Sequence, residues 1–310
     1  MSSSTGLPPL RSLLKSKEVE DPVNLYVHRP LAYLIVALLF RTPITPNGIT
    51  LMAMLVGVTA GACWLEGSHP AMIAGGILLW LSAILDGADG IMARAKNMHS
   101  QLGRALDGTA DMVVATCTVV PAYIHLWHKH HSLWQVAVMV PVVLTTIIHL
   151  NLYDFYKESY LRMTRIKQGG EGEDRPLIEA RVEKMRQERV RWFVNFAMRG
   201  VFLPFLKLQE RLVRLTNPKG MRGEDMPAAT ETSAKIYREH HRMPMRLWTF
   251  ISLAPHSYLT AIFAMFDRID IYLWLRLLGM NFLFIVVLIW QRRASGRTSY
   301  LFSLMPQSAA

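Results

Sequence analysis

Four aspartates stand close together in the sequence as two pairs. They are Asp86 and Asp89, at the end of one apolar stretch, and Asp107 and Asp111, at the start of the next. Residues three or four apart share one face of a helix, so each pair would present two carboxylates in the same direction. Ionised carboxylates repel one another and are costly near hydrocarbon, so the arrangement requires cations. Carboxylates without His or Cys favour magnesium, manganese or calcium over zinc or copper.

Glycine and arginine residues lie between the two pairs. Gly90 and Gly103 lack side chains where a bulky phosphate donor would approach the helices closely, and Arg94 carries a planar fork of donors suited to phosphate oxygens. Two divalent ions about 4 Å apart can stabilise the attacking and leaving oxygens of a displacement at phosphorus. The residues therefore predict a metal-dependent site for a pyrophosphate-linked donor.

The complete spacing resembles a known signature. The segment contains, in order, Asp86, two residues, Asp89-Gly90, two residues, Ala93-Arg94, eight residues, Gly103, three residues, Asp107, three residues and Asp111. This pattern resembles that of the CDP-alcohol phosphotransferases (CDP-alcohol phosphatidyltransferases) of class I, a family of integral membrane enzymes. The resemblance implies a CDP-linked donor, an alcohol acceptor, release of CMP and a role in phospholipid biosynthesis.

The resemblance also implies roles for individual residues. Asp86, Asp89, Asp107 and Asp111 would bind Mg²⁺ or Mn²⁺, with two ions expected, and Asp111 would also be the catalytic base that removes the proton of the acceptor hydroxyl. Gly90, Arg94 and Gly103 would hold the CDP moiety. A homodimer is expected on the resemblance alone.

A second element of the resemblance precedes the first long apolar stretch. Thr45-Pro46-Asn47-Gly48-Ile49-Thr50 is similar to the Pro-Asn-x-x-Thr element of the family, in which Asn47 and Thr50 would contact the CDP group. Asn and Thr are also common at helix starts, so a simple cap explains them equally well.

The composition is typical of an all-α, polytopic membrane protein. Half of the residues (51%) are hydrophobic, and the chain has 18 Met and 8 Trp. The short run Leu31 to Phe40 follows charged residues and is expected to be an interfacial amphipathic helix. Six stretches are long enough to cross about 30 Å of hydrocarbon: 48–66, 71–93, 102–127, 132–153, 247–266 and 270–290.

Basic residues predict the orientation. Lys and Arg collect before the first span, between the second and third spans, along 154–246 and after 290, whereas the opposite connections have few. The first twenty residues also lack the apolar core of a signal peptide. The pattern places both termini and the aspartates at the cytoplasmic side of a cytoplasmic (inner) membrane. A net charge of +11 then indicates contact with anionic membrane lipid rather than with nucleic acid.

These predictions divide the chain into membrane and cytoplasmic segments. The basic insert includes a charged helix at 176–191 and a surface helix at 192–215 that Pro204 could break; a solvated hairpin without catalytic importance is the alternative. The segments are a cytoplasmic N-terminus with the interfacial helix (1–45), spans one to four with the motif (46–153), the insert (154–246), spans five and six (247–290) and a cytoplasmic tail (291–310).

The acceptor is the least defined part of the prediction. His149 and Asn151 are polar groups at the end of the fourth span and are candidates for acceptor binding, although hydrogen bonds between helices would explain them equally well. Family members that use phosphorylated acceptors often have Arg after the last aspartate, where this chain has Met112. Phosphatidyl transfer from CDP-diacylglycerol is expected, with an aminoalcohol phosphotransferase that uses CDP-choline or CDP-ethanolamine and diacylglycerol as the alternative.

Two other classes also place aspartates in helical membrane bundles. A membrane prenyltransferase would carry its aspartate clusters in separate halves of the bundle, whereas here both pairs flank one short turn. A cation-coupled transporter would often show an internal repeat, and none is visible in this sequence.

Overall fold

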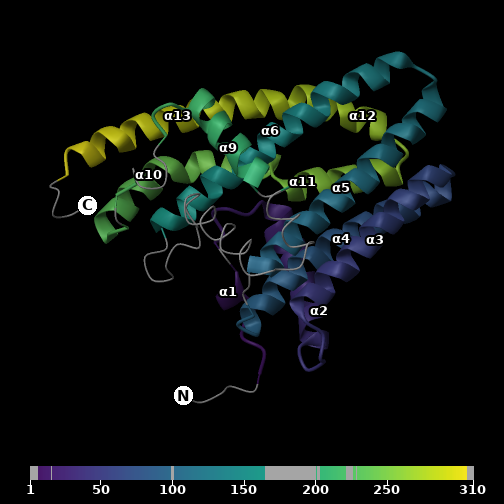
Figure 1. Cartoon of the computed structure of the whole chain (residues 1–310), viewed down its shortest axis with the longest axis horizontal. Helices are drawn as coiled ribbons and strands as arrows, with labels where there is room; N and C mark the ends of the chain where they lie inside the picture. Colours follow the sequence, from purple (N-terminus) through teal and green to yellow (C-terminus); the bar gives the residue numbers. More distant parts are fainter. Residues whose placement is uncertain are drawn as a thin grey trace. The chain divides into compact units, whose positions relative to one another are not determined.

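The computed structural model describes residues 6–14, 16–98, 101–164, 200, 203–220, 226–227 and 229–305. Every regular element in these ranges is helical, as expected (Figure 1). The N-terminal elements are α1 (Leu10–Leu13), η1 (Asn24–His28) and α2 (Arg29–Leu39). The long helices are α3 (Pro46–Glu66), α4 (His69–Ala95), α5 (Gln101–His130) and α6 (Leu133–Thr164). They are followed by α9 (Leu203–Thr216), α10 (Glu231–Trp248), η4 (Thr249–Ile251), α11 (Leu253–Met265), α12 (Ile269–Trp274), η5 (Leu275–Met280) and α13 (Asn281–Ser303).

The chain forms two compact units. The first comprises residues 1–142 and 253–277, and the second comprises residues 143–252 and 278–310. The first unit holds the whole aspartate motif, on α4 and α5.

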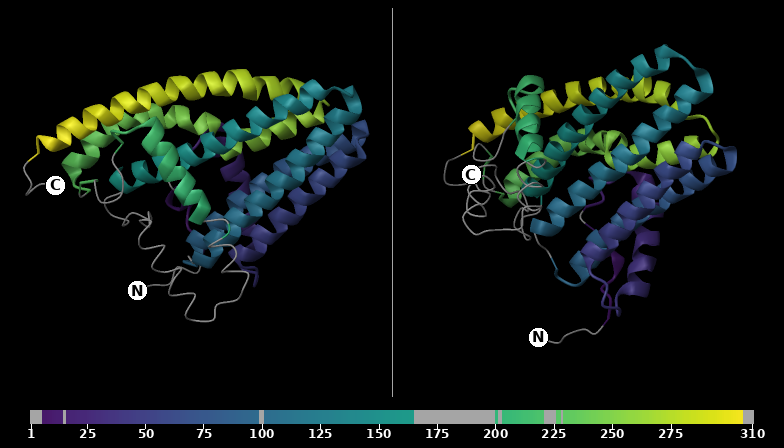
Figure 2. Two further views of the ribbon diagram at one scale, coloured as in Figure 1. Left: turned by 45° about the horizontal axis from the view of Figure 1, so that its top comes forward. Right: turned by 45° about the vertical axis from the view of Figure 1, so that its right-hand side comes forward.

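Short caps join α3 to α4 as an antiparallel hairpin. Thr45 caps α3 by accepting from the Gly48 amide at 3.2 Å, with Pro46 in the first turn, where a missing N–H has no cost. Gly67 ends α3 in the left-handed region (φ 79°), and Ser68 at once caps α4. The two views in Figure 2 show α3 and α4 running side by side.

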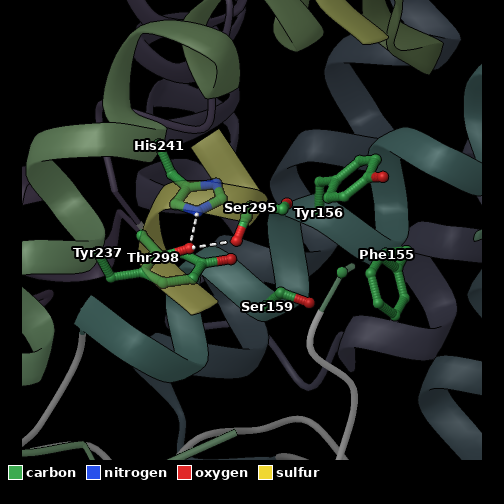
Figure 3. Close-up of a pocket in the computed structure, with 8 residues that line it drawn as sticks. Phe155, Tyr156, Ser159, Tyr237, His241, Ser295 and Thr298 are labelled. Carbon is green, nitrogen blue, oxygen red and sulfur yellow. Dashed lines mark hydrogen bonds between the residues drawn. The ribbon is translucent and has the colours of Figure 1, made fainter. Parts of the chain in front are cut away.

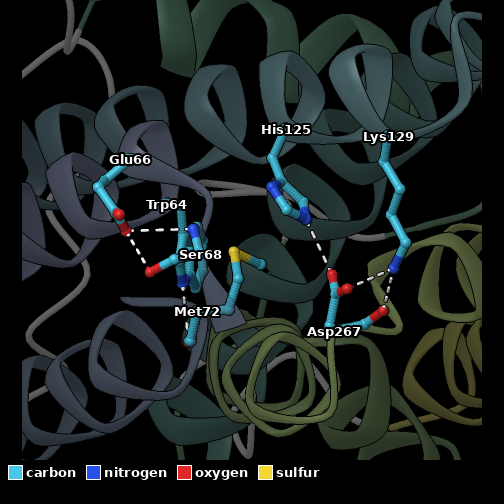
Figure 4. Close-up of polar contacts among 7 residues, drawn as sticks. All are labelled: Trp64, Glu66, Ser68, Met72, His125, Lys129 and Asp267. Carbon is cyan, nitrogen blue, oxygen red and sulfur yellow. Dashed lines mark hydrogen bonds and ion pairs between the residues drawn. The ribbon is translucent and has the colours of Figure 1, made fainter. Parts of the chain in front are cut away.

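Polar contacts join the helices at the end of the unit that carries this hairpin turn (Figure 4). Asp267, between α11 and α12, lies 2.8 Å from His125 Nε2 and 2.6 Å from Lys129 Nζ, both on α5. Hydrogen bonds from Lys129 and His125 outweigh the effect of burial and leave the pKa of Asp267 below its ordinary value. The contacts fix α5 relative to the α11–α12 turn.

Glycines allow the helices to approach closely. A Cβ added to Gly61 of α3 would lie 1.6 Å from the Cys117 carbonyl oxygen of α5, and one on Gly57 would lie 2.7 Å from Val114. Small residues four apart are a common device for helix contact in membranes. The close packing of α3 on α5, and of α4 on α3, sets the positions of the two helices that carry the aspartates.

The N-terminal elements pack on the motif end of this unit. Leu13 of α1 and Ala32 and Val36 of α2 are buried against Ile49 of α3 and Ile91 of α4. The expected interfacial element is present as a short apolar helix, Asn24–Leu39. Its position at a membrane surface stays a prediction.

Among the described residues, five helices are long and apolar enough to cross a membrane, and the chain is an integral membrane protein. The spans are Pro46–Glu66, His69–Ala95, Leu106–His130, Ala137–Thr164 and Ile269–Ser303. Large apolar side chains on them are exposed to the surroundings, among them Leu55, Ile77, Leu144 and Phe282. Such surfaces are expected where lipid is the solvent.

The predicted span 247–266 differs from the structure. Instead of one helix, this stretch contains the end of α10, the 3₁₀ turn η4 and α11. The 13 residues of α11 extend about 20 Å at 1.5 Å per residue, less than the hydrocarbon thickness. Two helices extend beyond the ends of the expected spans. α6 continues past residue 153 to Thr164, and α13 continues past residue 290 to Ser303.

Only part of the insert can be compared with prediction. The helix expected at 176–191 lies outside the described residues, as do 192–199 and 201–202. The described part of the expected surface helix is α9, which includes Pro204. Gln209 of α9 donates to the Asn151 carbonyl of α6 at 3.0 Å.

Candidate metal and nucleotide site

Three aspartates from two helices converge in the first unit. Each of Asp86 and Asp89 on α4 and Asp107 on α5 offers an oxygen within 4.8 Å of the others. Asp89 is buried, and the other two are half-buried. We call these three residues the aspartate cluster. A set of carboxylate oxygens at this spacing suits a hard divalent cation such as Mg²⁺ or Mn²⁺.

The turn between α4 and α5 makes this convergence possible. Asn97 adopts a left-handed conformation (φ 52°), and the Met98 amide bonds the Ala93 carbonyl at 2.8 Å, just after α4 ends at Ala95. Lys96 then donates to the Thr42 and Ile44 carbonyls at 3.2 and 3.0 Å, which ties this turn to the start of α3.

The fourth motif aspartate, Asp111, lies one turn further along α5 and is half-buried. Its carboxylate is near enough to repel that of Asp86, but it is not one of the three residues whose oxygens meet. The structure thus distinguishes Asp111 from the aspartate cluster, although all four were expected as metal ligands. Its metal and base roles stay predictions.

Thr50 makes a contact that the sequence did not suggest. Its side chain is 4% exposed, and its hydroxyl lies 2.5 Å from Asp89 Oδ2. Neither Asn47 nor Thr50 caps α3, because Thr45 fills that role. Asn47 is exposed in the first turn of α3. The two residues that were expected to act together at the CDP group therefore have different surroundings.

Arg94 and Gly90 lie together, as the nucleotide prediction requires. A Cβ on Gly90 would come within 3.3 Å of Arg94 Nη1 and 3.5 Å of Nη2, so the guanidinium covers the glycine. Arg94 Nε donates to the Leu13 carbonyl at 2.5 Å. This bond to the N-terminal segment fixes the plane of the guanidinium. Gly103 is half-buried in the first turn of α5.

A second arginine near the aspartates was not anticipated. Arg29 at the start of α2 donates to the Gly87 carbonyl at 3.2 Å and pairs with Glu20 at 2.9 Å. Its charge attracts the Asp86 carboxylate. An Arg before a proline is the only local signal, and nothing in the sequence relates it to a residue 58 positions away.

His149 and Asn151 belong to the second unit. His149 is 1% exposed, lies 3.1 Å from Asn281 Oδ1 of α13 through Nε2 and packs on Phe284. Asn151 is 2% exposed and donates to the Ile147 carbonyl at 2.8 Å. For His149, the alternative of an interhelical hydrogen bond describes the observed contact.

The second unit also contains a buried polar network (Figure 3). His241 of α10 lies between Gln291 and Thr298 of α13, at 2.9 and 3.1 Å, and stacks on Tyr237 at 4.0 Å. The adjoining cavity measures about 10 Å³, the space of one water molecule. Burial, with a smaller effect of His240, lowers the pKa of His241 to about 3.

Comparison with known proteins identifies the motif region. The profile of the family described as CDP-alcohol phosphatidyltransferase matches residues 43–168. Residues 43–168, less than half of the chain, are thus similar to this family. The match includes the aspartate cluster, Asp111, Arg94 and the entry to α3, and it ends before α9.

Two family relatives illustrate how far the similarity extends. A phosphatidylinositol phosphate synthase of Mycobacteroides abscessus is 35% identical over 75 residues, which are 24% of this chain and 33% of that protein. A CDP-diacylglycerol–serine O-phosphatidyltransferase of Mycobacterium tuberculosis is 33% identical over 109 residues, which are 35% of this chain and 36% of that protein. The chain thus spans about a third of the length of these relatives.

Proposed function

We propose that the protein transfers a phosphatidyl group from CDP-diacylglycerol to an alcohol, with release of CMP, in phospholipid biosynthesis. The observation that carries this proposal is the aspartate cluster, formed by motif residues of two helices within 4.8 Å. The choice of donor is supported by the similarity to the CDP-diacylglycerol–serine O-phosphatidyltransferase of Mycobacterium tuberculosis. In the reaction, the acceptor oxygen forms a bond to phosphorus as the bond between phosphorus and the CMP oxygen breaks.

Each part of the site has one task in this proposal. Asp86, Asp89 and Asp107, with Asp111 beside them, hold one or two Mg²⁺ or Mn²⁺ ions, which when bound neutralise charge on the phosphates and lower the pKa of a nearby hydroxyl. Arg94, above Gly90, binds phosphate oxygens of the donor. Gly103 and Asn47 complete the CDP contacts.

Asp111 is the proposed base for the acceptor. It stands outside the aspartate cluster but within electrostatic reach of Asp86, so it is close to the metal ligands without being one of the three convergent oxygens. This placement suits a carboxylate that takes the proton of the acceptor hydroxyl. His149 and Asn151 remain candidates for binding the acceptor.

We also propose that the enzyme is a homodimer with its termini and aspartates at the cytoplasmic side. Besides the five spans, α11 would be a sixth helix inside the membrane, although its 13 residues are too few to cross it alone. Basic residues at the ends of spans, among them Arg94, Lys96 and Arg292, support this orientation, because cytoplasmic segments next to spans are rich in Lys and Arg.

The proposal is tested with the purified full chain and a panel of substrates. CDP-diacylglycerol is supplied with serine, inositol phosphate or glycerol phosphate, and CDP-choline or CDP-ethanolamine is supplied with diacylglycerol. We expect CMP only with CDP-diacylglycerol and one of the alcohols. CMP release only from CDP-choline or CDP-ethanolamine would instead identify an aminoalcohol phosphotransferase.

A further inference from the structure

The contact between Thr50 and Asp89 joins two helices at the metal site. Thr50 is on α3 and Asp89 on α4, 39 positions apart, and the atoms are 2.5 Å apart. Both side chains are buried, at 4% and 8% exposure. A buried hydroxyl that bonds a carboxylate with a proposed metal role lies in the position from which outer residues orient ligands.

The hydroxyl proton of Thr50 has two acceptors within reach. Thr50 Oγ1 lies 3.2 Å from the Pro46 carbonyl, the usual contact of a helical threonine, and 2.5 Å from Asp89 Oδ2. One hydroxyl has one proton and cannot donate to both at once. The carboxylate is the stronger acceptor and the closer one, so the proton belongs to the bond with Asp89.

We propose that Thr50 is a positioning residue of the metal site, which orients Asp89 rather than contacting the nucleotide. A hydrogen bond to Oδ2 restricts rotation of the carboxylate, and Asp89 can then present its remaining lone pairs toward Asp86 and Asp107. Because Thr50 is fixed in the close packing of α3 on α4, it holds Asp89 without a change in its own conformation. This inference rests on the proposed metal-binding function of the aspartate cluster.

Substitutions at Thr50 distinguish a role in orienting Asp89 from a role in contacting the nucleotide. Thr50→Val keeps the shape of the side chain and removes the hydroxyl, whereas Thr50→Ser keeps the hydroxyl. Thr59→Val is the matched control, because Thr59 is on the same helix and its hydroxyl bonds the Leu55 carbonyl at 2.8 Å rather than an aspartate of the cluster. Thr50→Ala, which is smaller than valine, repeats the test if Thr50→Val does not give a monodisperse protein.

The experiment measures Mn²⁺ binding to the purified full chain by electron paramagnetic resonance, without substrate. We expect Thr50→Val to weaken Mn²⁺ binding by about 10-fold or more, the usual effect of removing such a partner, while Thr50→Ser and Thr59→Val bind like the unsubstituted protein. Equal Mn²⁺ affinity in Thr50→Val and the unsubstituted protein would overturn the proposal.

A second measurement tests whether Thr50 contacts the nucleotide instead of orienting Asp89. Binding of CDP-diacylglycerol is measured in the same variants without metal. Weaker donor binding with unchanged Mn²⁺ affinity would assign Thr50 to the nucleotide and contradict the positioning role. If the unsubstituted protein itself bound no Mn²⁺, the proposed metal site would fail, which is distinguishable from a failure confined to Thr50.

Discussion

Asp89 of α4 and Asp107 of α5 present carboxylate oxygens within 4.8 Å of one another, although 18 positions separate them in the chain. Without a cation, this proximity is unfavourable, because like charges repel and Asp89 is buried. The helix turn at Asn97 and the close packing of α3 with both helices hold the two residues together. The cluster is therefore a property of the fold rather than of a flexible loop.

Removing one ligand of this cluster should weaken metal binding. We expect Asp107→Asn to lower Mn²⁺ affinity and to abolish CMP release, because an amide oxygen carries no charge for the cation. Calorimetry and a CMP assay measure the two effects. The control is Glu66→Gln, which changes a carboxylate at the α3–α4 turn. Unchanged Mn²⁺ affinity in Asp107→Asn would be inconsistent with the cluster as the metal site.

Asp111→Asn should separate proton transfer from binding. The amide has nearly the same shape as the carboxylate but cannot accept the acceptor proton, so we expect turnover to fall about 10²–10⁴-fold. The variant should remain folded and bind CDP-diacylglycerol, as measured by gel filtration and equilibrium binding. Met112→Leu, at the neighbouring exposed position, is the control. Turnover near that of the unsubstituted protein would refute the base assignment.

Gly61 should tolerate no side chain. The Cβ of Gly61→Ala would lie 1.6 Å from the Cys117 carbonyl oxygen, so α3 and α5 must separate. We expect a loss of about 1–3 kcal/mol or more, seen as a lower thermal midpoint in detergent. Gly296→Ala is the control, because among the described residues the nearest atom to its Cβ would be Lys219 Cδ, at 3.8 Å. Equal midpoints for the two variants would show that α3 and α5 are not closely packed.

The stability of the second unit should depend on pH through His241. Burial lowers the pKa of His241 to about 3, below the ordinary 6.5. The unfolded state therefore binds the proton first as pH falls, so this contribution to stability is complete above pH 6.5 and decreases toward pH 3. The limiting slope is about 1.4 kcal/mol per pH unit.

Thermal unfolding between pH 7.5 and 5 tests this dependence. We expect the midpoint of the unsubstituted protein to decrease more steeply than that of His241→Gln, which has no group to protonate. His69→Gln, which changes an exposed histidine, should retain the full dependence. Parallel profiles for the unsubstituted protein and His241→Gln would mean that His241 is not buried as a neutral ring.

The sequence predicts the parts of the site that depend on one helix. The spacing of Asp86 and Asp89, and of Gly90 and Arg94, follows from the period of α4, and the structure brings the residues of each pair together. Contacts between distant segments have no such signature. The bonds of Thr50 to Asp89 and of Arg29 to the Gly87 carbonyl depend on how α2 and α3 pack against α4.

The segment 247–266 shows why apolar composition alone misplaced a span. Its hydrophobic residues satisfy a length criterion, but Pro255 has no N–H to continue a helix from Ile251. The helix is interrupted at Ser252, whose backbone is extended (ψ 176°). The Ser252 hydroxyl donates to the Thr249 carbonyl at 2.8 Å. Pro255 is therefore the signal in the sequence for this break, and hydropathy alone does not register it.

The most direct test of the proposed reaction follows the phosphorus atom itself. CDP-diacylglycerol labelled with ³²P in the phosphate next to diacylglycerol is incubated with the full chain, Mg²⁺ and the accepted alcohol. We predict equal amounts of CMP and of a new labelled phospholipid, and neither product with Asp107→Asn or with a chelator. CMP release with the label recovered as phosphatidic acid, or no new labelled phospholipid from the active preparation, would contradict transfer to an alcohol.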